Sequence, residues 1–127
     1  MKYLIELTEE QMRLVCNCLE DQSRLASGQW PMRHLVEEML RDLPFEEQMS
    51  RRMQVEELFM QAKQILLPET PDNGSLGYNG TPFIGNTYQI YRTILHQLAV
   101  DHDWNNVYSS SALPSGTMGT VKITKLG

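Results

Sequence analysis

The residues best suited to bind a ligand lie in and just after a long glycine-rich segment. Residues 68–86 hold three of the six prolines and four of the eight glycines of the chain. Glycine allows backbone N–H groups to approach a ligand closely, and the positive end of a helix favours an anion. Tyrosine can stack on a planar group, and arginine can bind a phosphate. The segment therefore predicts a phosphate or nucleotide pocket. Its candidate ligand-binding residues are Tyr78, Asn79, Thr81, Asn86, Thr87, Tyr91 and Arg92.

The same segment also has a purely structural interpretation. Glycine and asparagine are common in turns, and Asn79-Gly80 is a strong turn dipeptide. Tyr91 would then belong to the hydrophobic core of a helix that begins at Asn86. A structureless stretch of this length is uncommon in a compact domain and is usually either functional or mobile. Both interpretations stay open at the level of the sequence.

A second group of candidate ligand-binding residues stands where the first predicted helix ends. It consists of Arg24, Gln29, Trp30 and Arg33. Arginine and tryptophan together suit bidentate recognition of an anion and stacking. They suit equally well a helix corner in which arginine stems lie along apolar surface. This cluster is the second candidate site.

The sequence lacks the motifs that would indicate an enzyme or a metal site. No nucleophile elbow, phosphate-binding P-loop or dinucleotide fingerprint is present. The three histidines form no zinc motif, and Cys16 and Cys18 diverge by about 200° on a helix, so they cannot easily share a metal or form a disulfide. His102 lies between two aspartates, but its place at a helix end explains it better than catalysis does. We expect a protein that is not an enzyme and has no cofactor and no metal.

Composition and charge narrow the class of protein further. The chain has 127 residues and 14.7 kDa, with 11 basic against 16 acidic residues and a net charge of −5. This size fits a single domain over residues 1–127, and the acidic balance argues against a protein that coats nucleic acid. No apolar run approaches the roughly 18 residues that a membrane helix needs, and the first residues do not resemble a signal peptide. A cytoplasmic protein with no membrane partner is expected.

Hydrophobic periodicity predicts an α+β fold. Apolar residues at helical spacing predict four helices, at about 9–27, 31–42, 55–66 and 87–100. Residues 2–7 and 120–125 alternate as strands do, and 106–109 form a weaker strand candidate. We therefore expect about four helices packed on a small two- or three-stranded antiparallel sheet that the terminal strands form.

Several local signals refine the helices. Thr8 and Gln11 match a capping box at the start of the first helix, and Gly28 is expected to end it. Asn86 is expected to cap the last helix. The clearest core stripe lies on the third helix and consists of Val55, Leu58, Phe59, Ala62, Ile65 and Leu66, with Lys63 on the solvent side.

A resemblance adds a biological context. The order of L-T-E-E-Q, R-L-A-S-G-Q, K-Q-I-L-L, G-S-L-G-Y and N-T-Y-Q-I-Y-R-T-I-L-H-Q-L-A resembles small accessory proteins of tailed phages and prophages over residues 7–101. The resemblance implies a phage product that acts in the host cytoplasm, and it transfers no catalytic residue. Accessory proteins of this class often counter host defence by sequestering nucleotide messengers or by blocking a host protein.

Two hypotheses for the function follow. The first is a non-catalytic phage-type protein that binds and sequesters an anionic nucleotide signal. The alternative is a protein-interaction module that binds and inhibits a host protein or self-assembles, and a homo-oligomer is expected in either case. A ligand pocket should gather arginine and tyrosine from distant segments into one concavity, whereas a partner surface should leave leucine, methionine or phenylalanine exposed.

Overall fold

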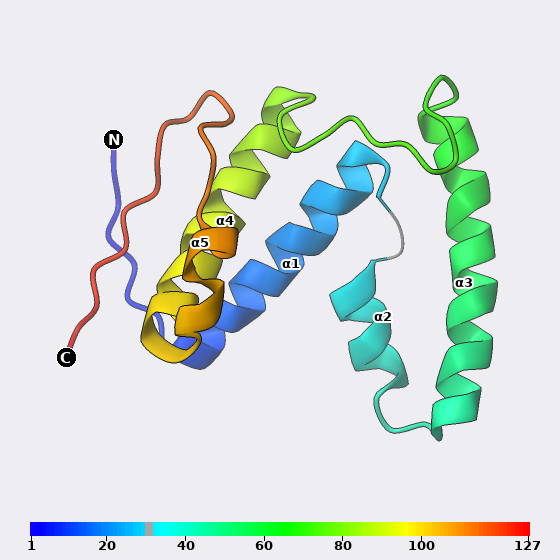
Figure 1. The fold of residues 1–127 in the computed structure, drawn as a ribbon, viewed down its shortest axis with the longest axis horizontal. Coiled ribbons are helices and arrows are strands. Elements are labelled where there is room, and N and C mark those ends of the chain that lie inside the picture. The colour runs from blue at the N-terminus through cyan, green and yellow to red at the C-terminus, as the bar shows by residue number, and fades with distance from the viewer. Residues whose placement is uncertain (30–31) are drawn as a thin grey trace.

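The computed structural model describes residues 1–29 and 32–127, and every regular element in these residues is helical (Figure 1). The elements are α1 (Glu9–Ser27), α2 (Arg33–Leu40), α3 (Phe45–Leu66), α4 (Pro82–His102), the 3-10 helix η1 (Trp104–Asn106) and α5 (Val107–Ser110). None of the described helices is both long enough and apolar enough to cross a membrane.

The hydrophobic core lies between α1 and α4, which run side by side (Figure 1). Its buried members are Cys16, Tyr88, Tyr91, Ile94 and Leu98. Partly buried apolar side chains, among them Met12 and Leu19 of α1, pack around this cluster. The α4 residues of the core recur three or four positions apart, which places them on one face of the helix. The helical spacing within residues 87–100 predicts Tyr91, Ile94 and Leu98 in the core, and these three positions are confirmed, whereas Tyr88 was not among the predicted core residues.

The ends of α1 follow the signals in the sequence. The Thr8 hydroxyl accepts from the backbone N–H of Gln11, and the Gln11 side chain accepts from the backbone N–H of Thr8, so the predicted capping box is confirmed. Gly28 ends the helix with φ of +89°, a left-handed conformation that glycine adopts without steric cost. The chain then turns from α1 toward α2.

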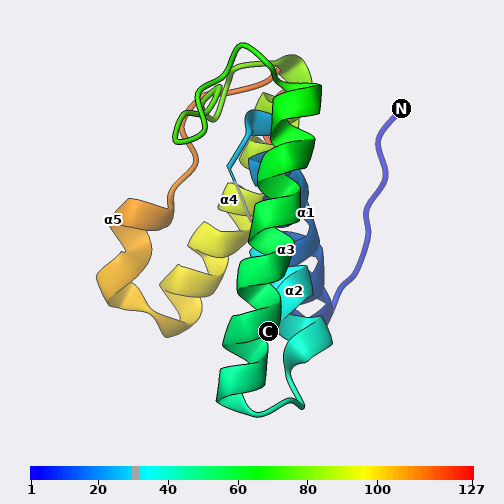
Figure 2. The ribbon, with the colours of Figure 1, turned by 90° about the vertical axis from the view of Figure 1, so that its right-hand side faces the viewer.

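Helices α2 and α3 form an arm beside the α1–α4 pair, and we call residues 33–66 the α2–α3 arm (Figures 1 and 2). A carboxylate of α1 holds the near end of the arm, because Asp21 accepts from the backbone N–H groups of His34 at 3.1 Å and Leu35 at 2.8 Å. These two N–H groups lie in the first turn of α2, where the helix itself offers them no acceptor. Asp21 therefore caps a helix other than its own.

The far helix of the arm, α3, contains one buried lysine, which holds the segment that follows the helix. Lys63 is 1% exposed, and its Nζ donates to the carbonyl oxygens of Asp72 at 2.9 Å and Gly74 at 2.7 Å. The predicted core stripe of this helix is wrong, since Leu58 and Ile65 are largely exposed and the supposedly solvated Lys63 is buried. An amphipathic pattern shows which residues share a face, but it does not show which face finds a partner.

The predicted α+β fold is wrong, because no sheet is present in the described residues. Residues 1–7 are exposed along their length, and residues 120–125 lie against α4 instead of pairing with another strand. The backbone N–H of Val121 donates to the Gln89 side chain at 3.1 Å, and Ile123 packs on the core. Polar side chains of a helix thus replace a partner strand. Residues 106–109, the third strand candidate, fall in η1 and α5.

The start of α4 also differs from the expectation. The helix begins at Pro82 with Thr81 as its N-cap, and the Thr81 hydroxyl accepts from the backbone N–H of Ile84 at 3.2 Å. Proline suits the first turn of a helix because its missing N–H would have no acceptor there. Asn86, the predicted cap, therefore lies within the helix.

Candidate functional site

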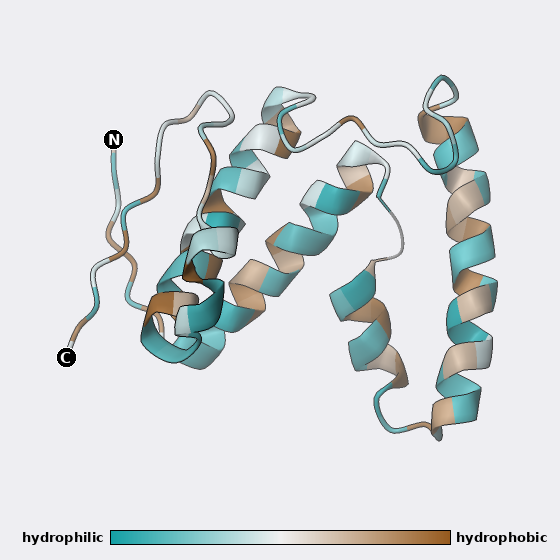
Figure 3. Cartoon of the chain, in the orientation of Figure 1, coloured by the Kyte–Doolittle hydropathy of each residue, from teal (hydrophilic) through white to brown (hydrophobic). Residues whose placement is uncertain are grey.

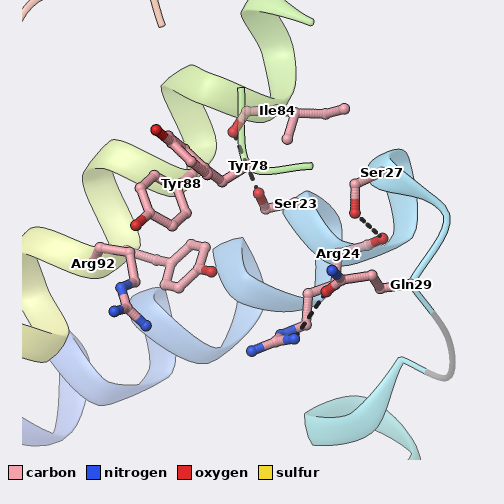
Figure 4. A pocket seen from close by; sticks show the side chains of 9 residues that line it. Ser23, Arg24, Ser27, Gln29, Tyr78, Ile84, Tyr88 and Arg92 are labelled. Atoms are coloured by element: carbon pink, nitrogen blue, oxygen red, sulfur yellow. Dashed lines mark hydrogen bonds between the residues drawn. The ribbon is translucent and has the colours of Figure 1, made fainter. Parts of the chain in front are cut away.

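A pocket of about 210 Å³ opens between the C-terminal half of α1, the segment before α4 and the first half of α4. Figure 4 shows its side chains, which include two arginines and come from three separate parts of the chain. The lining residues are Ser23, Arg24, Ser27, Gln29, Tyr78, Ile84, Tyr88, Tyr91 and Arg92. The pocket therefore joins the two candidate clusters that the sequence analysis treated separately.

Three tyrosine rings form one wall of this pocket. The rings of Tyr78 and Tyr88 are 4.8 Å apart between centroids and tilted by 37°, and those of Tyr88 and Tyr91 are 5.6 Å apart and nearly perpendicular. The guanidinium carbon of Arg92 lies 5.6 Å from the centroid of the Tyr88 ring, within the range of a cation–π interaction. Tyr88, Tyr91 and Arg92 share a face of α4 because they are three and four residues apart.

Arg92 carries a positive charge that no carboxylate neutralises in the described part of the chain. One of its terminal nitrogens, Nη2, donates to the carbonyl oxygen of Ser109. Its Nε is buried and is the one such side-chain nitrogen or oxygen for which the described residues provide no hydrogen-bond partner. A buried donor without a partner loses its hydration and gains nothing in exchange. The Nε of Arg92 is thus a buried donor whose hydrogen-bonding capacity the described residues leave unused.

Arg24, on the other side of the pocket, is already paired. Its Nε donates to Glu20 at 2.8 Å, and its Nη1 donates to the side-chain oxygen of Gln29 at 2.9 Å. Glu20 also lies 3.0 Å from Nε2 of His34. Burial raises the pKa of the Glu20 carboxyl, but the hydrogen bonds with His34 and Arg24 outweigh it, so this pKa lies below its usual value. Glu20 is therefore ionised at neutral pH and offsets the charge of Arg24, while that of Arg92 remains.

The other polar groups of the pocket are neutral. Burial raises the pKa of the Tyr91 hydroxyl, and the nearby guanidiniums offset that effect only in part. Ser23 donates its hydroxyl proton to the carbonyl of Ile84 at 3.3 Å, and Ser27 donates to the carbonyl of Arg24 at 2.9 Å (Figure 4). Neither serine is hydrogen-bonded to a histidine or a carboxylate that would activate it as a nucleophile.

The structure brings together five of the eleven candidate ligand-binding residues. Those that line the pocket are Arg24, Gln29, Tyr78, Tyr91 and Arg92. Arg33 lies on α2, where it pairs with Glu37 at 3.3 Å, and Trp30 falls outside the described residues.

The remaining four candidates have structural partners instead. Thr81 caps α4, and the buried Thr87 donates to the carbonyl of Phe83 at 2.9 Å within the same helix. Asn79 accepts from the backbone N–H of Gly116 at 3.0 Å, and Asn86 accepts from that of Thr117 at 2.7 Å. The two asparagines therefore fasten the C-terminal segment to the start of α4. Their side chains are used by the fold and do not line the pocket.

Four lining residues were not among the candidates. They are Ser23, Ser27, Ile84 and Tyr88. A signal for two of them is present in the sequence, because Ser23 and Ser27 are four residues apart and flank Arg24 on a predicted helix, so they lie on its face toward α4. Tyr88 could have been found from its spacing to Arg92. Ile84 carries no such signal, since the predicted helix began after it.

The part of the chain that the structure describes contains no group of three or more histidine, cysteine, aspartate or glutamate side chains that could hold a metal ion. Comparison of the chain with protein-family models, with curated proteins and with solved structures found no match.

Proposed function

We propose that this protein binds, without converting it, a small anionic ligand with a planar group, such as a nucleotide signal. The observation that carries the proposal is the guanidinium of Arg92, a donor that no carboxylate of the described residues pairs, in a pocket lined by three tyrosines. A phosphate oxygen would satisfy this donor and neutralise the guanidinium, which is the strongest use of an arginine in a partly buried site. The tyrosine rings would accommodate the planar part of the ligand by stacking.

The dimensions of the pocket favour a small ligand. Pockets for drug-sized molecules usually measure about 300–1,000 Å³. The 210 Å³ found here accommodates one base or one phosphate-sized group, and the rest of the ligand would extend into solvent. A mononucleotide or a cyclic nucleotide fits this description better than a nucleic-acid chain does. The net charge of −5 also disfavours a long polyanion.

The resemblance to small accessory proteins of phages supports a biological role for this binding. A small phage protein that holds a nucleotide messenger without converting it would lower the concentration of the free signal in the host cytoplasm. Such a protein needs a selective pocket and no catalytic group, and the serine hydroxyls of the pocket are indeed bonded to backbone carbonyls. We therefore propose sequestration of an anionic nucleotide signal as the biological role.

A thermal-shift screen tests the proposal. We expect a cyclic or linear nucleotide to raise the melting temperature, because a ligand at 100 times its Kd stabilises the folded state by about 2.7 kcal/mol. Inorganic phosphate alone should act at much higher concentration, since it lacks the planar group. A screen in which neither phosphate nor any nucleotide stabilises the protein would contradict the proposal.

Two arginine variants then locate the site. Arg92→Ala should weaken binding of the nucleotide by about ten- to a hundredfold, because charge-assisted hydrogen bonds contribute about 1.5–3 kcal/mol. Arg33→Ala is the matched control, since Arg33 is an exposed arginine outside the pocket. Equal affinities of the two folded variants would exclude this pocket as the binding site.

A further inference from the structure

The chain exposes far more surface than a compact monomer of its mass. Its accessible surface is 9356 Å², whereas a folded monomer of 14.7 kDa exposes about 6,900 Å². The excess is about 2,400 Å². The extended ends of the chain contribute to it, and so does the α2–α3 arm, which stands beside the core helices instead of packing along them (Figures 1 and 2).

The exposed surface of the arm is apolar on more than one side of α3. Met53 and Leu58 are both more than half exposed, and they lie about 140° apart around the helix axis. Figure 3 shows hydrophobic residues along much of this helix. The large apolar side chains that α3 exposes are Phe45, Met49, Met53, Leu58, Ile65 and Leu66. Large apolar side chains exposed on two sides of a helix form a surface that a partner can cover.

We propose that a second copy of this chain covers the arm, so that the protein is a homodimer with the α3 helices antiparallel at its centre. A self-complementary interface of this kind is the commonest form of protein oligomer. A stable interface removes about 800 Å² from each partner, and the surface excess of the chain is large enough to supply it. This dimer is independent of the proposed ligand, because the pocket lies between α1 and α4, outside the arm.

The charges of α3 favour a second copy in the antiparallel orientation. The helix carries three charged pairs in succession, which are Glu46-Glu47, Arg51-Arg52 and Glu56-Glu57. A twofold axis near Gln54 places Arg52 of one copy level with Glu56 of the other, and both residues lie within about 100° of Met53 around the helix axis. A parallel arrangement in register would instead place like charges level with each other, which opposes association. The helix is therefore complementary to itself in one orientation.

The mass of the protein in solution tests the proposal. We expect light scattering or sedimentation to give twice 14.7 kDa for the wild-type chain at micromolar concentration. Met53→Glu should shift the protein to the monomer, with Kd raised by about a hundredfold or more, because a charge would then be desolvated within the interface. Met118→Glu is the matched control, since Met118 is also largely exposed (81% against 65% for Met53) but lies outside the arm, and this variant should remain dimeric. Met53 is exposed in the single chain, so circular dichroism should show both variants to be folded.

A charge exchange tests the antiparallel orientation. Arg52→Glu should weaken the dimer by about tenfold, and the double change Arg52→Glu with Glu56→Arg should restore most of the affinity. A wild-type protein that stays monomeric at high concentration would overturn the proposal and leave the arm as a surface for a different protein. A dimer that tolerates Met53→Glu would overturn it as well. A wild-type protein that forms the dimer but binds no nucleotide would contradict only the proposed function.

Discussion

Helices α3 and α4 are nearly equal in length, yet they take opposite roles in the molecule. Nine of the 21 residues of α4 are buried, whereas Lys63 is the single buried residue among the 22 of α3. Both sequences carry apolar residues at helical spacing, so both helices form. The difference is that α4 packs its apolar face on α1, while α3 leaves most of its large apolar side chains exposed. Amphipathic spacing therefore specifies a helix, and the identity of its partner depends on contacts distant in sequence.

The first prediction concerns packing in the two regions. Ile94→Ala removes a buried side chain from the α1–α4 core and should destabilise the fold by about 2–5 kcal/mol. Leu58→Ala on the arm should change stability by less than about 0.5 kcal/mol, because Leu58 is mostly exposed. Urea unfolding measures both, at a concentration too low for the arms to associate. Equal losses in the two variants would mean that α3 packs as closely as α4.

The second prediction concerns the one buried attachment of α3. Lys63→Met keeps most of the apolar stem but removes the donors to the carbonyls of Asp72 and Gly74, so stability should fall by about 1–3 kcal/mol. Cleavage between residues 67 and 81 by a protease should become faster, since the lysine holds this segment. Lys122→Met, at an exposed lysine, is the control and should leave both measurements unchanged. A similar response of the two variants would remove Lys63 as the anchor of the arm.

The same contrast explains what the sequence could and could not predict about the fold. The capping box at Thr8, the stop at Gly28 and the core stripe of α4 depend on residues close together in the chain, and all were predicted correctly. The prediction of a terminal sheet was wrong because an alternating pattern does not specify the segment with which a strand pairs. Residues 120–125 contact side chains of α4 instead of pairing with another strand.

The predictions for the candidate site show the same difference between local and long-range contacts. Tyr91 and Arg92 were identified as candidates from their place on a helix that follows the glycine-rich segment, and the pocket contains both. Asn79 and Asn86 have the composition of a binding loop, but their amides hold a segment about 30 residues further on. Local composition cannot distinguish an amide that awaits a ligand from one that binds the chain itself.

The third prediction concerns the joint between the two regions. Asp21→Ala removes the acceptor for the first N–H groups of α2 and should destabilise the protein by about 1 kcal/mol, as the loss of a helix cap does. Asp42→Ala is the control, because the Asp42 side chain is almost fully exposed. Hydrogen exchange should show that the amides of His34 and Leu35 lose protection in the first variant only. Unchanged protection would show that Asp21 does not cap α2.

The smallest expected effect concerns Glu20, which contacts Arg24 in the pocket and His34 on the arm and so connects the two regions. Burial opposes ionisation of Glu20, but its hydrogen bonds with His34 and Arg24 prevail and lower the pKa in the folded state. A carboxyl with a lowered folded-state pKa contributes stability that is fully present above its unfolded pKa of about 4.5 and is lost as the pH falls through the folded value. Glu20→Gln should therefore be less stable than wild type at neutral pH, and the difference should shrink as the pH is lowered below about 4.5.

Unfolding by urea at several pH values between neutral and about 3 measures this difference, in a range that spans the usual glutamate pKa. Glu10→Gln provides the control, because Glu10 is an exposed glutamate of the same helix, so its profile should follow that of the wild-type protein. The contact also predicts that Glu20→Gln weakens the hold of α1 on α2, since the amide replaces a charged acceptor by a neutral one. Parallel acid profiles of wild type and Glu20→Gln would show that the contacts of Glu20 with Arg24 and His34 do not stabilise the fold.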